Sequence, residues 1–376
     1  MSAKRIEELD VIKGIGMVII ITVHLVYRTK AGAADLILRS LGWLFIAVYY
    51  MLAGYSYTNG KRTVTQNWLH RLKTLVLPAV STEAIMLVIG GLYCALFHGY
   101  TLTDWLHDVT VTVIRPELGM MISEEWGRGG VLFENLSPSW FVWTLAWTEL
   151  LFFPLAHIST GKGKARRWIT AAALTIVQIL LYVFVSPVSW QLQLVPLFTL
   201  FMLMGAKLRE SGLAEREWKP GTALTALIAA GCFAVHFGLF MLGGDESYYA
   251  GKIGLLGWQD VLLTIVQLPV GFVGMYALAK LILKAGAAAK PLKWLGSHTL
   301  IFLMCHCFFG MVAADFLHTF IKPGAMWYVE NAGLTLTPEI FFKSLAGAVF
   351  AAACCTGIGL LDDVFKSKRK QTAAGK

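Results

Sequence analysis

Long apolar stretches separated by short polar segments run along the whole chain. A helix that crosses a bilayer needs about 20 largely apolar residues. Ten stretches reach or approach that length, at residues 11–27, 36–57, 74–97, 140–157, 168–186, 190–208, 222–243, 260–283, 297–317 and 338–361. The pattern therefore predicts an all-α, polytopic membrane protein with about ten transmembrane helices.

The composition agrees with this pattern. Of the 376 residues, 57% are hydrophobic and 15% are charged, and the mean hydropathy is +0.63. Soluble domains have about 45–50% apolar and about 25% charged residues. Because the excess is spread along the chain, it excludes a soluble enzyme, a disordered chain and a protein with a single anchor. We expect one integral-membrane domain over residues 1–376, with a long loop at 98–139 and a basic tail at 362–376.

The basic residues predict the orientation of this domain. Lys and Arg accumulate in cytoplasmic loops of membrane proteins. Here 22 of them lie in the two terminal segments and in every second connection, whereas six lie in the alternate connections. This asymmetry predicts that both termini are cytoplasmic and that loop 98–139 is outside. The net charge of +9 is thereby explained by topology, so we expect no nucleic-acid partner.

The cysteines do not predict a disulfide framework or a metal site. All six lie within the apolar stretches, and no loop carries a pair of them. Cys305, His306 and Cys307 resemble part of a metal-binding motif, but the chain has no second pair at zinc-site spacing. We therefore expect no metal.

The first predicted helix has a polar face. At 100° per residue, Asp10, Lys13 and His24 fall on one side of it. Lys13 and His24 are separated by about 16 Å along the helix axis, so Lys13 lies near the cytoplasmic mouth and His24 at mid-depth or beyond. Ionisable residues at membrane depth usually mark functional sites. In the alternative interpretation, Lys13 reaches toward the headgroups and His24 bonds a neighbouring carbonyl.

Other ionisable residues lie well inside predicted helices. Glu83, Glu149 and His306 are candidates for a site in the membrane. His306 is either a partner of His24 or a packed core residue, and the residues alone do not separate these alternatives. Trp140 begins an aromatic run that is typical of a membrane interface.

Several short motifs follow one another along the chain. The first helix begins RIEELDVIKGI at residues 5–15 and continues to His24; YYMLAGY occupies residues 49–55; Arg71 and Lys73 precede Pro78; SWFV occupies residues 139–142; and GSHTL at residues 296–300 precedes His306. In this order the motifs resemble those of the acyltransferase 3 family of bacterial integral-membrane O-acyltransferases. Lys13, Ala53 and Thr74 differ from the residues that the family commonly has.

The resemblance implies a function. The family transfers an acyl group, here expected to be acetyl from acetyl-CoA, from the cytoplasm to a hydroxyl of an envelope glycan or lipid-linked saccharide. We expect such an enzyme in the bacterial cytoplasmic (inner) membrane. His24 is the expected general base, because a neutral histidine accepts a proton near neutral pH.

The resemblance also suggests roles for the other candidates. Lys13, Arg71 and Lys73 are expected to hold the phosphates of coenzyme A, with Asp10 orienting Lys13. His306, Glu149 and Glu83 are expected to orient His24 or to bind the acceptor. Direct transfer and an acyl-enzyme intermediate are both compatible with the sequence.

Two other classes of protein also fit charged residues on about ten helices. One is a secondary transporter or lipid-glycan flippase, which uses charged residues near the bilayer midplane. The other is a membrane sensor or assembly factor, which needs neither His24 nor a coenzyme A site. Inverted repeats with broken helices would favour the transporter, and the sequence shows no convincing pair.

Overall fold

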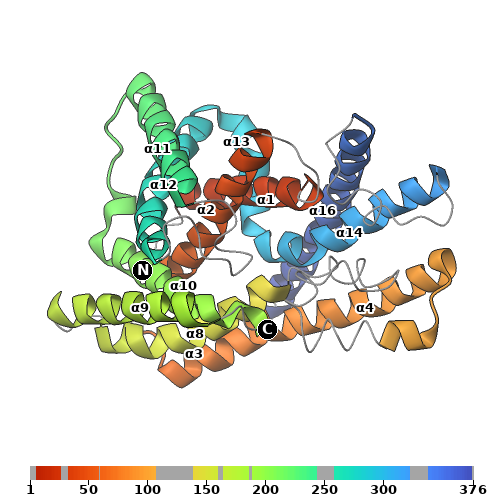
Figure 1. The fold of residues 1–376 in the computed structure, drawn as a ribbon, viewed down its shortest axis with the longest axis horizontal. Coiled ribbons are helices and arrows are strands. Elements are labelled where there is room, and N and C mark those ends of the chain that lie inside the picture. Colours follow the sequence, from red (N-terminus) through yellow and green to blue (C-terminus); the bar gives the residue numbers. More distant parts are fainter. Residues whose placement is uncertain are drawn as a thin grey trace.

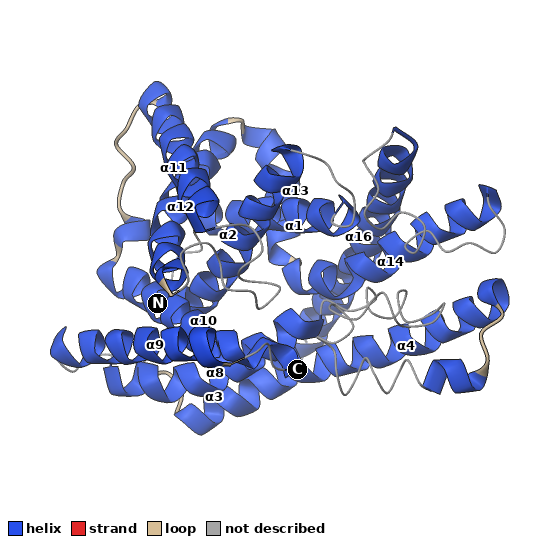
Figure 2. Cartoon of the chain, viewed as in Figure 1, coloured by secondary structure: helices blue, strands red, loops and turns tan. Residues whose placement is uncertain are grey.

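The computed structural model describes residues 6–26, 33–58, 60–106, 139–159, 164–185, 189–243, 258–321 and 338–374. All regular secondary structure in these ranges is helical (Figure 2). Most of the predicted outer loop, residues 107–138, lies outside the described residues. His24 and Trp140 lie in helices, but their side chains are outside the described part of the chain.

The helices follow the order that the apolar stretches predict (Figure 1). The α-helices are α1 (Glu7–Val26), α2 (Ala33–Ser56), α3 (Val64–Arg71), α4 (Leu77–His98), α8 (Ser139–Ser159), α9 (Lys164–Phe184), α10 (Val195–Ser211), α11 (Thr222–Gly243), α12 (Gln259–Lys284), α13 (Ala289–Ser297), α14 (Thr299–Ile321) and α16 (Pro338–Ala374). The π-helix η1 (Leu72–Val76) and the 3-10 helices η2 (Ser189–Leu194), η3 (Leu213–Glu215) and η4 (Gly286–Ala288) connect them.

Each of the ten predicted stretches coincides with a helix. Within the described residues, eight helices are long and apolar enough to cross a membrane, at Val64–His98, Phe141–Ser159, Ala165–Phe184, Leu192–Ser211, Thr222–Leu242, Gln259–Lys284, Thr299–Leu317 and Leu345–Lys368. A shorter apolar helix covers Ser40–Ser56, and α1 carries its charged residues near its start. The protein is therefore an all-helical, polytopic membrane protein, as predicted.

The third predicted helix begins earlier than the sequence analysis placed it. The Thr63 hydroxyl accepts a hydrogen bond from the Gln66 amide, and the Gln66 side chain accepts one from the Thr63 amide. This capping box starts α3, which continues through η1 into α4 as one rod along the lower edge of Figure 1. The rod ends at Gly99, whose φ of 67° suits a residue without a side chain.

The last helix continues past its predicted end. The stretch predicted to end at residue 361 is part of α16, which extends to Ala374, so most of the predicted basic tail is helical. No Gly or Pro interrupts residues 360–374. An ion pair of 2.5 Å between Asp362 Oδ2 and Lys366 Nζ, four residues apart, supports the extension.

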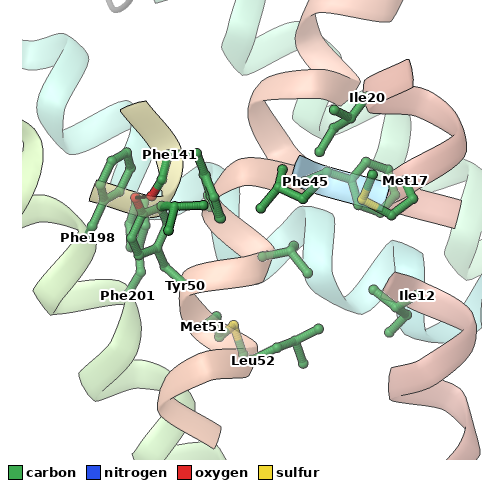
Figure 3. Close-up of a cluster of buried hydrophobic side chains, with 14 of the residues drawn as sticks. Ile12, Met17, Ile20, Phe45, Tyr50, Met51, Leu52, Phe141, Phe198 and Phe201 are labelled. Carbon is green, nitrogen blue, oxygen red and sulfur yellow. Dashed lines mark hydrogen bonds between the residues drawn. The ribbon is translucent and has the colours of Figure 1, made fainter. Parts of the chain in front are cut away.

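The helices α2 and α10 approach each other closely. A side chain on Gly54 would overlap the Met202 carbonyl, and one on Gly205 would overlap the Met51 carbonyl. Small residues allow this kind of backbone contact between membrane helices. Beside it, the ring of Tyr50 stacks on that of Phe198, with the centroids 3.9 Å apart (Figure 3).

The backbone of α1 is also in close contact with the backbone of α13. A side chain on Gly14 would overlap the Leu292 carbonyl of α13, and one on Gly296 would overlap the Asp10 carbonyl of α1. Ile12, on the opposite side of α1, and Met17, on the same side as Asp10 and Lys13, are both packed in the buried core (Figure 3). Since α1 also contacts α2, α12, α14 and α16, it lies at the centre of this part of the bundle.

Polar contacts between helices join ends that the charge pattern assigns to the same side. At the predicted cytoplasmic ends they are Lys280–Glu8, Lys293–Glu7 and Arg167–Glu210, at 2.6, 3.0 and 2.8 Å. At the predicted outer ends they are His98–Asp315 and Tyr182–Asp260, at 2.6 and 3.1 Å. This arrangement agrees with helices that alternate in direction, and the side that faces the cytoplasm stays a prediction.

The rod of α3, η1 and α4 allows a direct test of orientation. Lys61 precedes the rod and Leu102 follows it, and both are exposed. In intact cells, a membrane-impermeant thiol reagent should label a Leu102→Cys protein and not a Lys61→Cys protein. After permeabilisation both should react. Labelling of the unmodified protein gives the background from its own cysteines. Labelling of Lys61→Cys in intact cells would overturn the predicted topology.

Candidate active site

The polar face of α1 begins with an ion pair. Lys13 Nζ lies 2.9 Å from Asp10 Oδ1, and the carboxylate is buried whereas the ammonium is partly exposed. The residues are three apart on the helix, so they lie on the same side. The Tyr49 hydroxyl donates a 2.7 Å hydrogen bond to the Lys13 carbonyl and ties α2 to this point of α1. The structure thus brings Asp10 and Lys13 into contact, as the sequence analysis expected.

Other helices supply partners for the remaining acidic residues of α1. Lys293 of α13 pairs with Glu7, and Lys280 of α12 pairs with Glu8. Together with the pair at Lys13, three lysines balance three carboxylates at this end of α1. An anionic ligand that binds Lys13 must therefore compete with Asp10.

A second ion pair links α3 to α8. Arg71 Nη2 lies 2.5 Å from Glu149 Oε1, and the side chains are 33% and 2% exposed, respectively. From the sequence, Arg71 is expected to hold a coenzyme A phosphate and Glu149 to orient His24 or bind the acceptor, and the structure brings the two residues together. Because Glu149 is inside the protein, Arg71 supplies the opposite charge that a buried carboxylate needs.

Unsatisfied polar atoms lie on the helices that this pair joins. Glu149 Oε2, the Thr148 hydroxyl and Trp68 Nε1 are buried and have no hydrogen-bond partner among the described residues. Trp68 is three residues before Arg71, so it lies on the same side of α3. Leaving a buried polar group unpaired costs about 1–3 kcal/mol. These atoms therefore mark the contact of α3 and α8 as a place where a polar ligand would be stabilised.

The third predicted donor-binding residue, Lys73, does not take part in the contact of α3 with α8. Lys73 is exposed and has no ion-pair partner among the described residues. It lies two residues after Arg71, and residues at that spacing do not share a helix face. Arg71 and Lys73 therefore do not converge on one point of the α8 contact.

Two further candidates are not part of these pairs. Glu83 is half-buried on α4, about 18 Å beyond Arg71 along the rod. His306 is buried on α14, where its Nδ1 lies 2.6 Å from the Phe302 carbonyl and its Nε2 lies 3.3 Å from Cys307 Sγ. His24 is eleven residues beyond Lys13 on the continuous helix α1, so the predicted separation of about 16 Å along the axis holds.

A polar cluster that is not among the candidates predicted from the sequence lies at the predicted outer ends of α4 and α14. The Tyr93 hydroxyl and His98 Nε2 lie 2.7 and 2.6 Å from the same oxygen of Asp315, Oδ2. All three side chains lie in the interior. Asp315 is an ionisable residue inside a predicted helix, so the rule that selected Glu83 and Glu149 would also have selected it.

The Arg71–Glu149 pair predicts a measurable coupling. Arg71→Ala leaves a buried carboxylate without its partner, so it should lower the melting temperature in detergent. Adding Glu149→Gln should restore part of the loss, which corresponds to a coupling energy of about 1 kcal/mol or more. The more exposed pair Arg167–Glu210 is the control and should show weak coupling. Purely additive losses at Arg71 and Glu149 would show that the pair does not stabilise the protein.

Comparison with known proteins agrees with the motifs. The sequence model of the family described as Acyltransferase domain, the acyltransferase 3 family, matches residues 6–357. Comparisons with curated proteins and with solved structures find no match. The matched range runs from α1 into α16 and includes Asp10, Lys13, Arg71 and Glu149. The chain therefore belongs to the acyltransferase 3 family and is a membrane-bound acyltransferase.

Proposed function

We propose that this acyltransferase moves an acyl group, expected to be acetyl, from cytoplasmic acyl-CoA to a hydroxyl of an envelope glycan or lipid-linked saccharide. The observation that carries the proposal is the polar face of α1 at the centre of the bundle. It has a partly exposed lysine near one end and a histidine eleven residues further along. This spacing suits a donor that enters at one side and reacts deeper in the membrane. In this proposal the enzyme is one domain in the bacterial cytoplasmic membrane.

His24 is the proposed general base. A hydroxyl is a weak nucleophile at neutral pH, and a positioned histidine removes its proton as the oxygen attacks. The attack forms a carbon–oxygen bond at the thioester carbonyl and breaks the bond from that carbon to sulfur. The proton held by His24 then passes to the departing sulfur of coenzyme A. The overall reaction conserves protons and needs no further co-substrate.

The proposed donor route starts at Lys13. The phosphates of coenzyme A are anionic and cannot cross the bilayer core, so the donor enters from the cytoplasm. Lys13 binds a phosphate as a point charge. It lacks the bidentate hydrogen bonding of the arginine that the family commonly has at this position. Since Asp10 already holds Lys13, phosphate binding replaces one anionic partner by another. An extended pantetheine arm roughly covers the distance of about 16 Å to His24.

The α3–α8 contact is the second part of the proposed site. Arg71 is exposed enough to meet a ligand while Glu149 stays buried. The unsatisfied atoms of Trp68, Thr148 and Glu149 offer hydrogen bonds to a donor amide or to an acceptor hydroxyl. We place Glu83 and His306 further along the path and Lys73 at its cytoplasmic edge. Trp140 is the second residue of α8, near the predicted outer interface.

The direct test of this function is transfer in a purified system. The protein in detergent would be incubated with acetyl-CoA labelled in the acetyl group and with fractions of envelope glycan. The expected result is label bound to glycan through an alkali-labile ester. Failure to label glycan or lipid-linked saccharide from any acyl-CoA would contradict the proposal and favour a role without acyl-CoA chemistry.

Removal of the proposed base should stop turnover. His24→Ala should lower the transfer rate by about 10²–10⁴-fold. Acetyl-CoA should still bind, because His24 does not contribute to binding of its phosphates. The control is His157→Ala, which removes an exposed histidine at the end of α8 and should leave turnover unchanged. A well-folded His24→Ala protein with near-normal turnover would exclude His24 as the base.

Removal of the proposed phosphate ligands should weaken donor binding. Lys13→Ala and Arg71→Ala should raise the dissociation constant of acetyl-CoA, and added salt should raise it further because it screens exposed charges. Lys13→Arg should be tolerated. Direct binding to each variant in detergent is the measurement, and Arg167→Ala, which changes a cytoplasmic arginine paired with Glu210, is the control. Wild-type affinity in both alanine variants would place the donor route elsewhere.

A further inference from the structure

The thiol of Cys307 and the imidazole of His306, both on α14, are in contact in the protein interior. Cys307 Sγ is 3.3 Å from His306 Nε2. The two residues are 6% and 2% exposed, respectively. The proposed function gives a role to His306 in the path but none to Cys307. A buried cysteine in contact with a histidine is a candidate nucleophile, because catalytic thiols are activated by an adjacent base.

The hydrogen bonds of His306 fix which nitrogen faces the thiol. A backbone carbonyl only accepts hydrogen bonds, so the 2.6 Å contact of His306 Nδ1 with the Phe302 carbonyl requires the proton on Nδ1. In the neutral ring, Nε2 is then the basic nitrogen, and it is the one that faces Cys307. A nucleophile, a base and a third group that orients the base together form the arrangement used by cysteine enzymes.

The depth of Cys307 matches the proposed path. Gly296 packs against the Asp10 carbonyl, which places the start of α14 level with Asp10. Along their helices, Lys13 is about 4.5 Å and His24 about 21 Å from Asp10, and Cys307 is about 12 Å from Thr299, the first residue of α14. Because α1 and α14 are in contact, Cys307 lies at a depth between the proposed phosphate site and the proposed base.

We propose that Cys307 carries the acyl group as a thioester between donor and acceptor, with His306 as its base. This inference rests on the proposed function, because it requires acyl-CoA as the donor. In the first step Cys307 Sγ attacks the carbonyl carbon of acyl-CoA. A carbon–sulfur bond to Cys307 forms, the bond to the coenzyme A sulfur breaks, and the thiol proton passes through His306 Nε2 to the coenzyme.

The second step returns the enzyme to its starting state. The acceptor oxygen attacks the carbonyl carbon of the Cys307 thioester, so a carbon–oxygen bond forms and the bond to Sγ breaks. His24 removes the hydroxyl proton, as in the proposed function, and the proton passes to Sγ. No oxidant, reductant or other reactant is consumed. The covalent intermediate divides one difficult transfer into two easier steps. Its burial keeps water away from it.

The test is acylation of the full-length protein in the absence of acceptor. After incubation with acetyl-CoA, intact-protein mass spectrometry should show one added acetyl group, located on Cys307 and released by neutral hydroxylamine. Cys307→Ala should abolish the adduct and lower turnover by about 100-fold or more. Cys305→Ala is the matched control, since Cys305 is buried on the same helix and has no assigned role, and it should keep both the adduct and the turnover.

A second variant separates chemistry from packing. Cys307→Ser is close in size but cannot form a thioester, so it should fold, bind acetyl-CoA and lose the hydroxylamine-sensitive adduct. Two-substrate kinetics of the wild type should follow a ping-pong pattern. Wild-type turnover in Cys307→Ala or Cys307→Ser would refute the intermediate and leave direct transfer with His24 intact. Absence of any reaction of the wild type with acyl-CoA would instead reject the proposed function together with this inference.

Discussion

Charged side chains of α1 can lie inside the bundle only because neighbouring helices supply opposite charges at short range. An unpaired charge inside the protein is costly, and the buried Asp10 and the partly buried Glu8 are each paired with a lysine, while the exposed Glu7 pairs with Lys293. These pairs require α12 and α13 to stay close to α1. Gly14 and Gly296 make this possible, since any side chain there would overlap the backbone of the facing helix. The position of the polar face, and hence of the proposed site, depends on this packing.

The same principle operates at the other buried charges. Arg71 compensates Glu149 across α3 and α8, and Tyr93 and His98 satisfy Asp315 across α4 and α14. Each contact joins helices that are distant in sequence. The polar residues therefore favour these particular contacts between helices.

The sequence predicts the helices well, because a run of apolar residues long enough to cross a bilayer can adopt few other structures. It is less informative about helix ends. The start of α3 depends on Thr63 and Gln66, a capping signature that is readable but lies outside the apolar stretch. The extension of α16 is likewise formed by charged residues that lie outside the apolar stretch, so the apolar pattern does not include it.

The site is partly predictable. Asp10 and Lys13 are neighbours on one helix, so their contact follows from helix geometry. The pairing of Arg71 with Glu149 depends on how α3 packs against α8, which no local pattern specifies. The contact of His306 with Cys307 is between adjacent residues, but the tautomer follows only from the observed bond to Phe302.

In the proposed function, an acyl group passes from acyl-CoA on the cytoplasmic side of the membrane to an acceptor on the other side. Sealed membrane vesicles of defined orientation test it most directly. Acetyl-CoA labelled in the acetyl group would be added outside the vesicles, and the label on glycan inside and outside would be measured separately. Inside-out vesicles, whose cytoplasmic face is exposed, should accumulate labelled glycan in the lumen, and right-side-out vesicles should not. Equal labelling in both orientations, or transfer only to acceptors on the donor's side, would contradict the proposed function.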